Sequence, residues 1–118
     1  MYRITKEFAF SASHQLIGLP EDHQCGRMHG HNYIVMIELS ANELNENGFV
    51  RDYQELAPLK AYIDDNFDHR HLNDVLSNDM VTAERLAKHF FDWAKARWSE
   101  VSAVRVCETP KTWAEYRP

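Results

Sequence analysis

One short stretch of the sequence combines a thiol with two imidazoles. It reads Cys25-Gly26-Arg27-Met28-His29-Gly30-His31-Asn32-Tyr33. His29 and His31 are two positions apart, so their side chains point to the same face if the segment is a β-strand. Two such imidazoles need at least one further ligand to hold zinc, and a vacant fourth position would make the ion catalytic rather than structural. Cys25 lies just before this predicted strand, where a metal ion would favour its thiolate form.

Other candidate residues lie outside this stretch. His14 follows a predicted strand, and beside His29 and His31 it is the obvious third ligand of a three-histidine zinc site. Asp68 directly precedes His69, and a carboxylate that orients an imidazole is the usual support for a general base, although such pairs are also common on surface loops. Glu108 continues the apolar face of a predicted strand. Either that strand has already ended, or the carboxylate enters a pocket to bind a ligand.

The elements that must position these side chains follow from the hydrophobic pattern. Alternation predicts strands over residues 2–10, 31–39 (opening near 29), 101–107 and 111–116, with a short hairpin strand possible at 49–51. Helical spacing predicts two helices, one from Asp52 onward with its regular part starting near Pro58, and one from the N-cap Thr82 to about Trp98. The order β-β-α-α-β-β predicts an α+β domain, an antiparallel sheet with two helices on one face.

Two further expectations concern the surface of this domain. His89 lies off the apolar stripe of the second predicted helix, which predicts a solvated side chain. Nothing obvious blocks the edges of the sheet, which favours pairing with other subunits.

Composition limits the class of protein. The chain has 118 residues, enough for one domain with an ordinary core. Its net charge of −5 and the absence of a Lys/Arg run argue against a general nucleic-acid binder. Two cysteines, Cys25 and Cys107, are too few for a disulfide scaffold. The N-terminus does not resemble a signal peptide and no apolar run approaches the ~20 residues of a membrane helix, so we expect a cytoplasmic protein without membrane contact.

Four segments of the sequence together resemble the 6-pyruvoyltetrahydropterin synthase superfamily. They are Phe10-Ser11-Ala12-Ser13-His14, Cys25-Gly26-Arg27-Met28-His29-Gly30-His31, Asp68-His69-Arg70-His71-Leu72-Asn73 and Glu108-Thr109. The match runs in order through nearly the whole chain. Within the superfamily the sequence is most similar to the bacterial 6-carboxy-5,6,7,8-tetrahydropterin synthases of queuosine biosynthesis. The three-residue gap between Cys25 and His29 and the short loop from His14 to Cys25 are typical of that branch.

The resemblance implies a fold and a set of roles. The fold would be the tunnelling fold, whose subunits join their sheets into trimers that stack as a homohexamer, with active sites between subunits. His14, His29 and His31 would hold one zinc ion per subunit, and Cys25 would be the proton-abstracting base. Asp68 and His69 would form its relay across a subunit boundary. Glu108, often counted with the relay, would anchor the pterin ring with Thr109 beside it.

The resemblance also implies a reaction. The substrate would be 7,8-dihydroneopterin triphosphate, and the products 6-carboxy-5,6,7,8-tetrahydropterin, acetaldehyde and triphosphate. Lys6 and Arg27 are candidate cations for the triphosphate. One alternative keeps the site but forms 6-pyruvoyltetrahydropterin. A second alternative is a non-catalytic module in which Cys25 and the three histidines close a structural zinc site.

Overall fold

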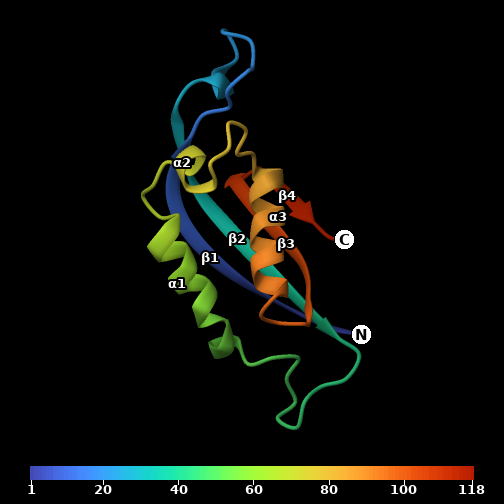
Figure 1. Ribbon diagram of the computed structural model, residues 1–118. Coiled ribbons are helices and arrows are strands. Elements are labelled where there is room, and N and C mark those ends of the chain that lie inside the picture. The colour runs from blue at the N-terminus through green and yellow to red at the C-terminus, as the bar shows by residue number, and fades with distance from the viewer.

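A computed structural model describes residues 1–118, and the elements follow the predicted order with additions. The elements are β1 (Tyr2–His14), the 3₁₀ turn η1 (Gln24–Gly26), β2 (His29–Ala41), the 3₁₀ turn η2 (Tyr53–Leu56), α1 (Ala57–Asn66), α2 (Leu72–Leu76), α3 (Ala83–Lys95), β3 (Val101–Thr109) and β4 (Thr112–Tyr116). The four strands form one antiparallel sheet in the order β1-β2-β3-β4. The helices pack on one face of that sheet, which confirms the predicted α+β arrangement (Figure 1). No helix has the length and apolar character needed to cross a membrane.

The two faces of β2 differ as the alternation predicts. Every second side chain of its central part is fully buried against the helices, and these are Tyr33, Val35, Ile37 and Leu39. The intervening residues Asn32, Ile34 and Met36 are exposed or half-buried on the other face. The helix-facing side chains join Phe10 of β1, Leu59 and Ile63 of α1 and Leu86 and Phe90 of α3 in a single core.

The predicted hairpin strand at residues 49–51 is wrong. The chain makes an irregular turn there, closed by the side chain of Asn45, whose Oδ1 accepts hydrogen bonds from the backbone of Asn47 and Phe49 at 3.0 Å. Because the side chain satisfies these N–H groups, the segment needs no strand partner. Only Val50 of the segment reaches the core.

The start of α1 confirms the tight first turn predicted around Pro58. Asp52 accepts a hydrogen bond from the N–H of Gln54 at 2.9 Å and caps the 3₁₀ turn η2. Proline occupies the first turn of α1, where a missing N–H costs nothing.

Two other expectations need correction. The short helix α2 was not predicted, because five residues are too few to show a helical period. His89 is half-buried rather than solvated, since its Nε2 lies 2.8 Å from the hydroxyl of Tyr62, and burial lowers its pKa.

One edge of the sheet is also better protected than expected. The segment 68–71 hydrogen-bonds to the outer edge of β1 at Ser11 and Ser13. The N–H of Ser13 donates to the carbonyl of Arg70 at 3.1 Å, and the N–H of His69 donates to the carbonyl of Ser11 at 2.6 Å. The outer edge of β1 therefore lies open only over residues 2–10.

Candidate metal centre

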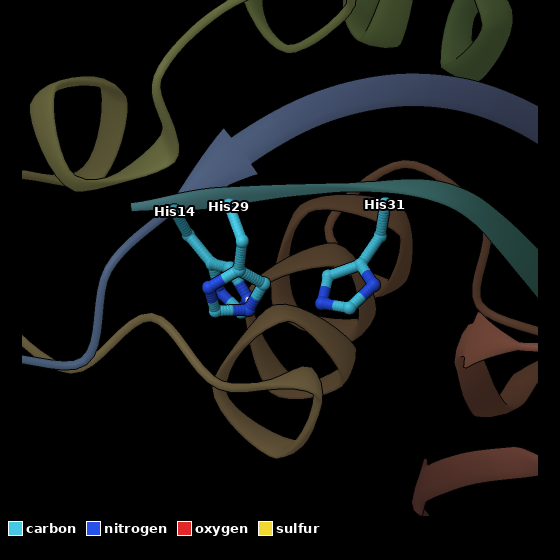
Figure 2. Close-up of side chains that lie close together, drawn as sticks. All are labelled: His14, His29 and His31. Atoms are coloured by element: carbon cyan, nitrogen blue, oxygen red, sulfur yellow. The ribbon is translucent and has the colours of Figure 1, made fainter. Parts of the chain in front are cut away.

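Three histidines meet where the hairpin of β1 and β2 leaves the sheet. His14 is the last residue of β1 and pairs in register with His29, the first residue of β2. His31 follows two positions later on the same face (Figure 2). One nitrogen from each ring lies within 4.8 Å of the other two, and the Nε2 atoms of His14 and His29 are 2.9 Å apart. The structure thus brings together the three residues predicted as ligands.

Hydrogen bonds fix the protonation of two of these rings. The Nδ1 of His14 lies 2.6 Å from the carbonyl oxygen of Val81, and the Nδ1 of His29 lies 2.6 Å from that of Arg27. A carbonyl only accepts, so both Nδ1 atoms carry the proton and both Nε2 atoms of the neutral rings present lone pairs. Two lone pairs that face each other at this distance repel, so the contact is stabilised either by a proton, which one ring then donates to the other, or by a metal ion that both rings ligate.

His31 completes the donor set. Its Nε2 is buried and has no hydrogen-bond partner. Burial lowers the pKa of both His14 and His31, which favours the neutral imidazole that a metal ion requires. The residues present therefore fit a metal ion held by three imidazoles, a set that suits zinc and leaves a fourth position for another ligand.

Glu108 borders this centre. Its Oε2 lies 3.8 Å from the Nε2 of His31, and its side chain is 27% exposed. The carboxylate makes no hydrogen bond. It also lines a cavity of about 370 Å³ between β4 and the first turn of α3, together with Glu84. The prediction that Glu108 enters a pocket is thus consistent with its position.

Tyr33 extends the same face of β2 beyond His31. Its ring stacks on Phe10 with centroids 5.0 Å apart and lies 5.5 Å from the ring of His31. The side chain is fully buried, and its hydroxyl has no hydrogen-bond partner. Burial raises the pKa of this phenol, and the nearby charge of Glu108 raises it further.

Asp68 and His69 form a pair at a different place. The Oδ2 of Asp68 accepts from the Nδ1 of His69 at 2.9 Å, and its Oδ1 accepts from the N–H of Ser11 at the same distance. His69 has a left-handed backbone with φ of 59°, which is uncommon outside glycine. Its side chain is 81% exposed at the outer edge of β1. The pair therefore lies outside the donor cluster, although His69 and His31 line one cavity of about 490 Å³.

Cys25 and Thr109 also lie outside the donor cluster. Cys25 is half-buried in η1, where its carbonyl accepts from the N–H of Leu16, and it is a free cysteine. The cluster consists of three imidazoles and no thiol. The hydroxyl of Thr109 lies 2.8 Å from that of Thr112 in the turn before β4. Lys6 and Arg27, the candidate side chains for binding the triphosphate, are both exposed.

Sequence patterns gave no indication of the groups that support the cluster. The carbonyls of Val81 and Arg27 orient two rings, but every residue carries a carbonyl, so no residue type marks them. In the sequence, Tyr33 is marked only as a member of the strand pattern. Its position two residues after His31 was the one available signal.

Comparisons with known proteins agree with this geometry. The family model described as 6-pyruvoyl tetrahydropterin synthase matches residues 3–118. A 6-carboxy-5,6,7,8-tetrahydropterin synthase of Synechocystis sp. is 32% identical over 98% of this chain and 93% of its own. One from Bacillus subtilis is 31% identical over 99% of this chain and 86% of its own. The solved 6-pyruvoyl tetrahydropterin synthase of Caenorhabditis elegans superposes with a TM-score of 0.86 at 26% identity, covering 99% of this chain and 95% of its own.

Proposed function

The chain belongs to the 6-pyruvoyl tetrahydropterin synthase family, and on that premise we propose that it is a lyase that converts 7,8-dihydroneopterin triphosphate to 6-carboxy-5,6,7,8-tetrahydropterin. The other products would be acetaldehyde and triphosphate, and the pathway would be queuosine biosynthesis in the cytoplasm. The observation that carries the proposal is the three-imidazole cluster at the end of the β1–β2 hairpin, with Glu108 at its border. The names of the Synechocystis and Bacillus relatives favour the carboxy product over the pyruvoyl product.

Zinc held by His14, His29 and His31 would act as a Lewis acid toward the hydroxylated side chain of the substrate. The remaining chemistry falls to side chains of the protein. Cys25 would take a proton from the carbon next to a hydroxyl, as a thiolate can do near neutral pH. The carboxylate of Glu108 would accept two parallel N–H bonds from the amino-pyrimidinone edge of the pterin, with Thr109 beside it.

Asp68 and His69 would serve as the proton relay. The carboxylate accepts from Nδ1 and therefore leaves the Nε2 of the ring to exchange protons. Because this imidazole is 81% exposed and lies outside the donor cluster of its own chain, it would act on the site of a neighbouring subunit. That role agrees with an assembly in which active sites lie between chains.

Product analysis tests the proposal directly. Purified, zinc-loaded protein is incubated with 7,8-dihydroneopterin triphosphate, and the products are separated by chromatography with mass detection. We expect acetaldehyde and 6-carboxytetrahydropterin in equal amounts. Accumulation of 6-pyruvoyltetrahydropterin without acetaldehyde would instead establish the pyruvoyl synthase activity, and no turnover with full zinc occupancy would contradict both.

A Cys25→Ala variant separates catalysis from a structural zinc site. The donor cluster contains no thiol, so we expect the variant to keep its full zinc content and to lose activity by about 10²–10⁴-fold, the range for one general base. Zinc is measured by elemental analysis and activity by acetaldehyde release. Loss of zinc in this variant would favour the closed Cys-His₃ module.

A further inference from the structure

Three buried side-chain atoms in the chain lack a hydrogen-bond partner, and two of them lie together. They are the Nε2 of His31 and the hydroxyl of Tyr33, and the third is the Nε of Arg105. His31 and Tyr33 are two positions apart on β2, face the same side, and have ring centroids 5.5 Å apart. Buried polar atoms without partners are rare in folded proteins, so each calls for an explanation.

Glu108 lies beside both of these residues. Its Oε2 is 3.8 Å from the Nε2 of His31. The strand pairing of Ile34 with Cys107 brings the next position of β3, Glu108, alongside Tyr33. The side chain is partly exposed and no hydrogen bond holds it, so it is free to rotate toward either neighbour.

The distance from Glu108 to His31 is close to that between two ligands of one ion. Tetrahedral zinc with bonds of about 2.0–2.1 Å holds its ligand atoms ~3.3 Å apart. A small rotation of Glu108 would thus bring a carboxylate oxygen to the fourth position of an ion held by the three histidines. The charge of Glu108 is also close enough to act on Tyr33, whose ring is fixed by stacking on Phe10, so the second oxygen of the carboxylate is the nearby acceptor for that hydroxyl.

We propose that, in the metal-loaded protein without substrate, the Glu108 carboxylate is the fourth ligand of the ion and the Tyr33 hydroxyl donates a hydrogen bond to its second oxygen. The metal then supplies the partner of His31, and Glu108 supplies the partner of Tyr33. Both otherwise unpaired atoms are satisfied by one movement of one side chain.

The arrangement has a consequence that rests on the proposed function. Glu108 is the residue proposed to bind the pterin edge, and one carboxylate cannot do this and ligate the ion with the same oxygens. A bound pterin would therefore draw Glu108 away and open the fourth position for its own side chain. The site would become reactive only when the ring that Glu108 recognises is present.

Azide can occupy a vacant ligand position on a metal ion. Its binding therefore tests, without any substrate, whether Glu108 ligates the ion. The protein is loaded with Co²⁺, whose visible absorption reports its ligands, and azide is titrated into the wild type and variants. We expect azide to bind at least tenfold more tightly to Glu108→Gln and Glu108→Ala than to the wild type, because the fourth position is vacated. Tyr33→Phe should give an intermediate gain of about threefold.

A matched control separates ligation from simple loss of negative charge. Glu84 lines the same cavity as Glu108 but is not paired with His31, so Glu84→Gln removes an equal charge without vacating the metal. We expect its azide affinity to stay within twofold of the wild type. Equal azide affinity in the wild type and both Glu108 variants would overturn the proposal, as would an equal gain in Glu84→Gln.

Chelator competition supplies a second measurement on the same proteins. Wild type should retain zinc against a chelator at least tenfold better than Glu108→Gln, and a few-fold better than Tyr33→Phe. Unchanged zinc affinity in both variants would overturn the proposal. Because neither measurement uses a pterin, their failure would leave the product analysis standing, and a failed product analysis would leave the ligation standing.

Discussion

Two backbone carbonyls set the chemistry of the histidine cluster. The carbonyls of Val81 and Arg27 each accept a hydrogen bond from the Nδ1–H of one imidazole, at 2.6 Å in both cases, and so direct the Nε2 lone pairs of His14 and His29 toward a common point. An ion that binds there finds two ligands already oriented, and little rotamer freedom is lost on binding. The two lone pairs also oppose each other until a cation arrives. The buried Nε2 of His31, which has no hydrogen-bond partner, favours a metal ion shared by all three rings over a hydrogen bond between His14 and His29 alone.

Substitution of His29 tests this assignment. His29→Ala removes one of the two opposed lone pairs, and we expect the zinc content to fall from one ion per chain to less than about 0.1 after dialysis. Elemental analysis measures the content, and circular dichroism checks that the protein is folded. His69→Ala is the control, because that ring is 81% exposed and lies outside the cluster, so it should keep its zinc. Full zinc in His29→Ala would remove His29 from the ligand set.

The sequence is sufficient to predict which three histidines come together. It is not sufficient to predict which backbone groups accept hydrogen bonds from them. The spacing of His29 and His31 predicts a shared face in a strand, and His14 follows the preceding predicted strand, whereas His23 lies in the connecting loop. The acceptor for His14 comes from residue 81, far along the chain, and depends on how the segment before α3 packs over the cluster. That packing is a property of the tertiary structure and no local pattern encodes it.

Among the elements, β1 shows how distant segments extend a strand. The alternation of large apolar residues ends at Phe10, which predicted a strand of residues 2–10, yet β1 continues to His14. Ser11, Ala12 and Ser13 are too small to give a pattern. They are held by β2 on one side and by the segment 68–71 on the other, through the bonds at Ser11 and Ser13. The extension places His14 opposite His29, so the candidate metal centre depends on it.

Glu38 of β2 joins the two ends of the chain. It is 4% exposed, accepts from Arg117 at 2.7 and 2.8 Å and from the hydroxyl of Ser102 at 2.6 Å, and lies 3.6 Å from Arg3. These donors, Arg117 first, lower the pKa of Glu38 to about 2, although burial opposes the shift. The carboxylate therefore holds the start of β1 and the C-terminal Arg117 against β2, a central strand of the sheet.

The lowered pKa predicts how stability depends on pH. Because the folded pKa is below that of the unfolded chain, near 4.5, the stabilisation is complete above that value and is lost as the pH falls toward 2. We expect Glu38→Gln to lower the free energy of unfolding by about 2 kcal/mol at pH 7 and the difference to shrink to nearly zero at pH 2. Urea unfolding at fixed protein concentration measures both.

The exposed Glu43, in the loop after β2, provides the control for this series. Glu43→Gln removes the same charge without a partner, so it should change the free energy of unfolding by less than about 0.5 kcal/mol at every pH. A Glu38→Gln variant whose deficit stays constant from pH 7 to pH 2 would contradict the assigned role of the Glu38 carboxylate.

The molecule is more elongated than a compact isolated domain of this length. Its radius of gyration is 15.4 Å, against ~13.5 Å for a compact chain of this length, and its longest dimension is 55 Å against 24 and 25 Å for the others. One face of the sheet carries no helix, and β1 and β4 are both edge strands. Edge strands carry unpaired N–H and C=O groups, which can pair with a strand of another chain. These features support contacts between copies of the chain through the open edges of the sheet, and the homohexamer remains the prediction from the family resemblance.

The parity of β1 identifies which backbone groups would make that junction. The N–H and carbonyl of Ser11 bond outward, to Asp68 and His69, so residues of the same parity also direct their N–H groups away from β2. Thr5 shares this parity and lies in the middle of the open edge, opposite Glu38 of β2. A proline at Thr5 would remove one outward donor and leave the pairing of β1 with β2 intact.

We therefore expect Thr5→Pro to weaken the assembly without unfolding the chain. In sedimentation velocity the wild type should run as six copies of the 13.9 kDa chain, and Thr5→Pro should shift to smaller species at the same concentration. Thr5→Ala keeps the N–H and should sediment as the wild type does. Circular dichroism should show the same strand content in all three. A Thr5→Pro variant that keeps the full wild-type mass would show that this edge of β1 makes no contact between subunits.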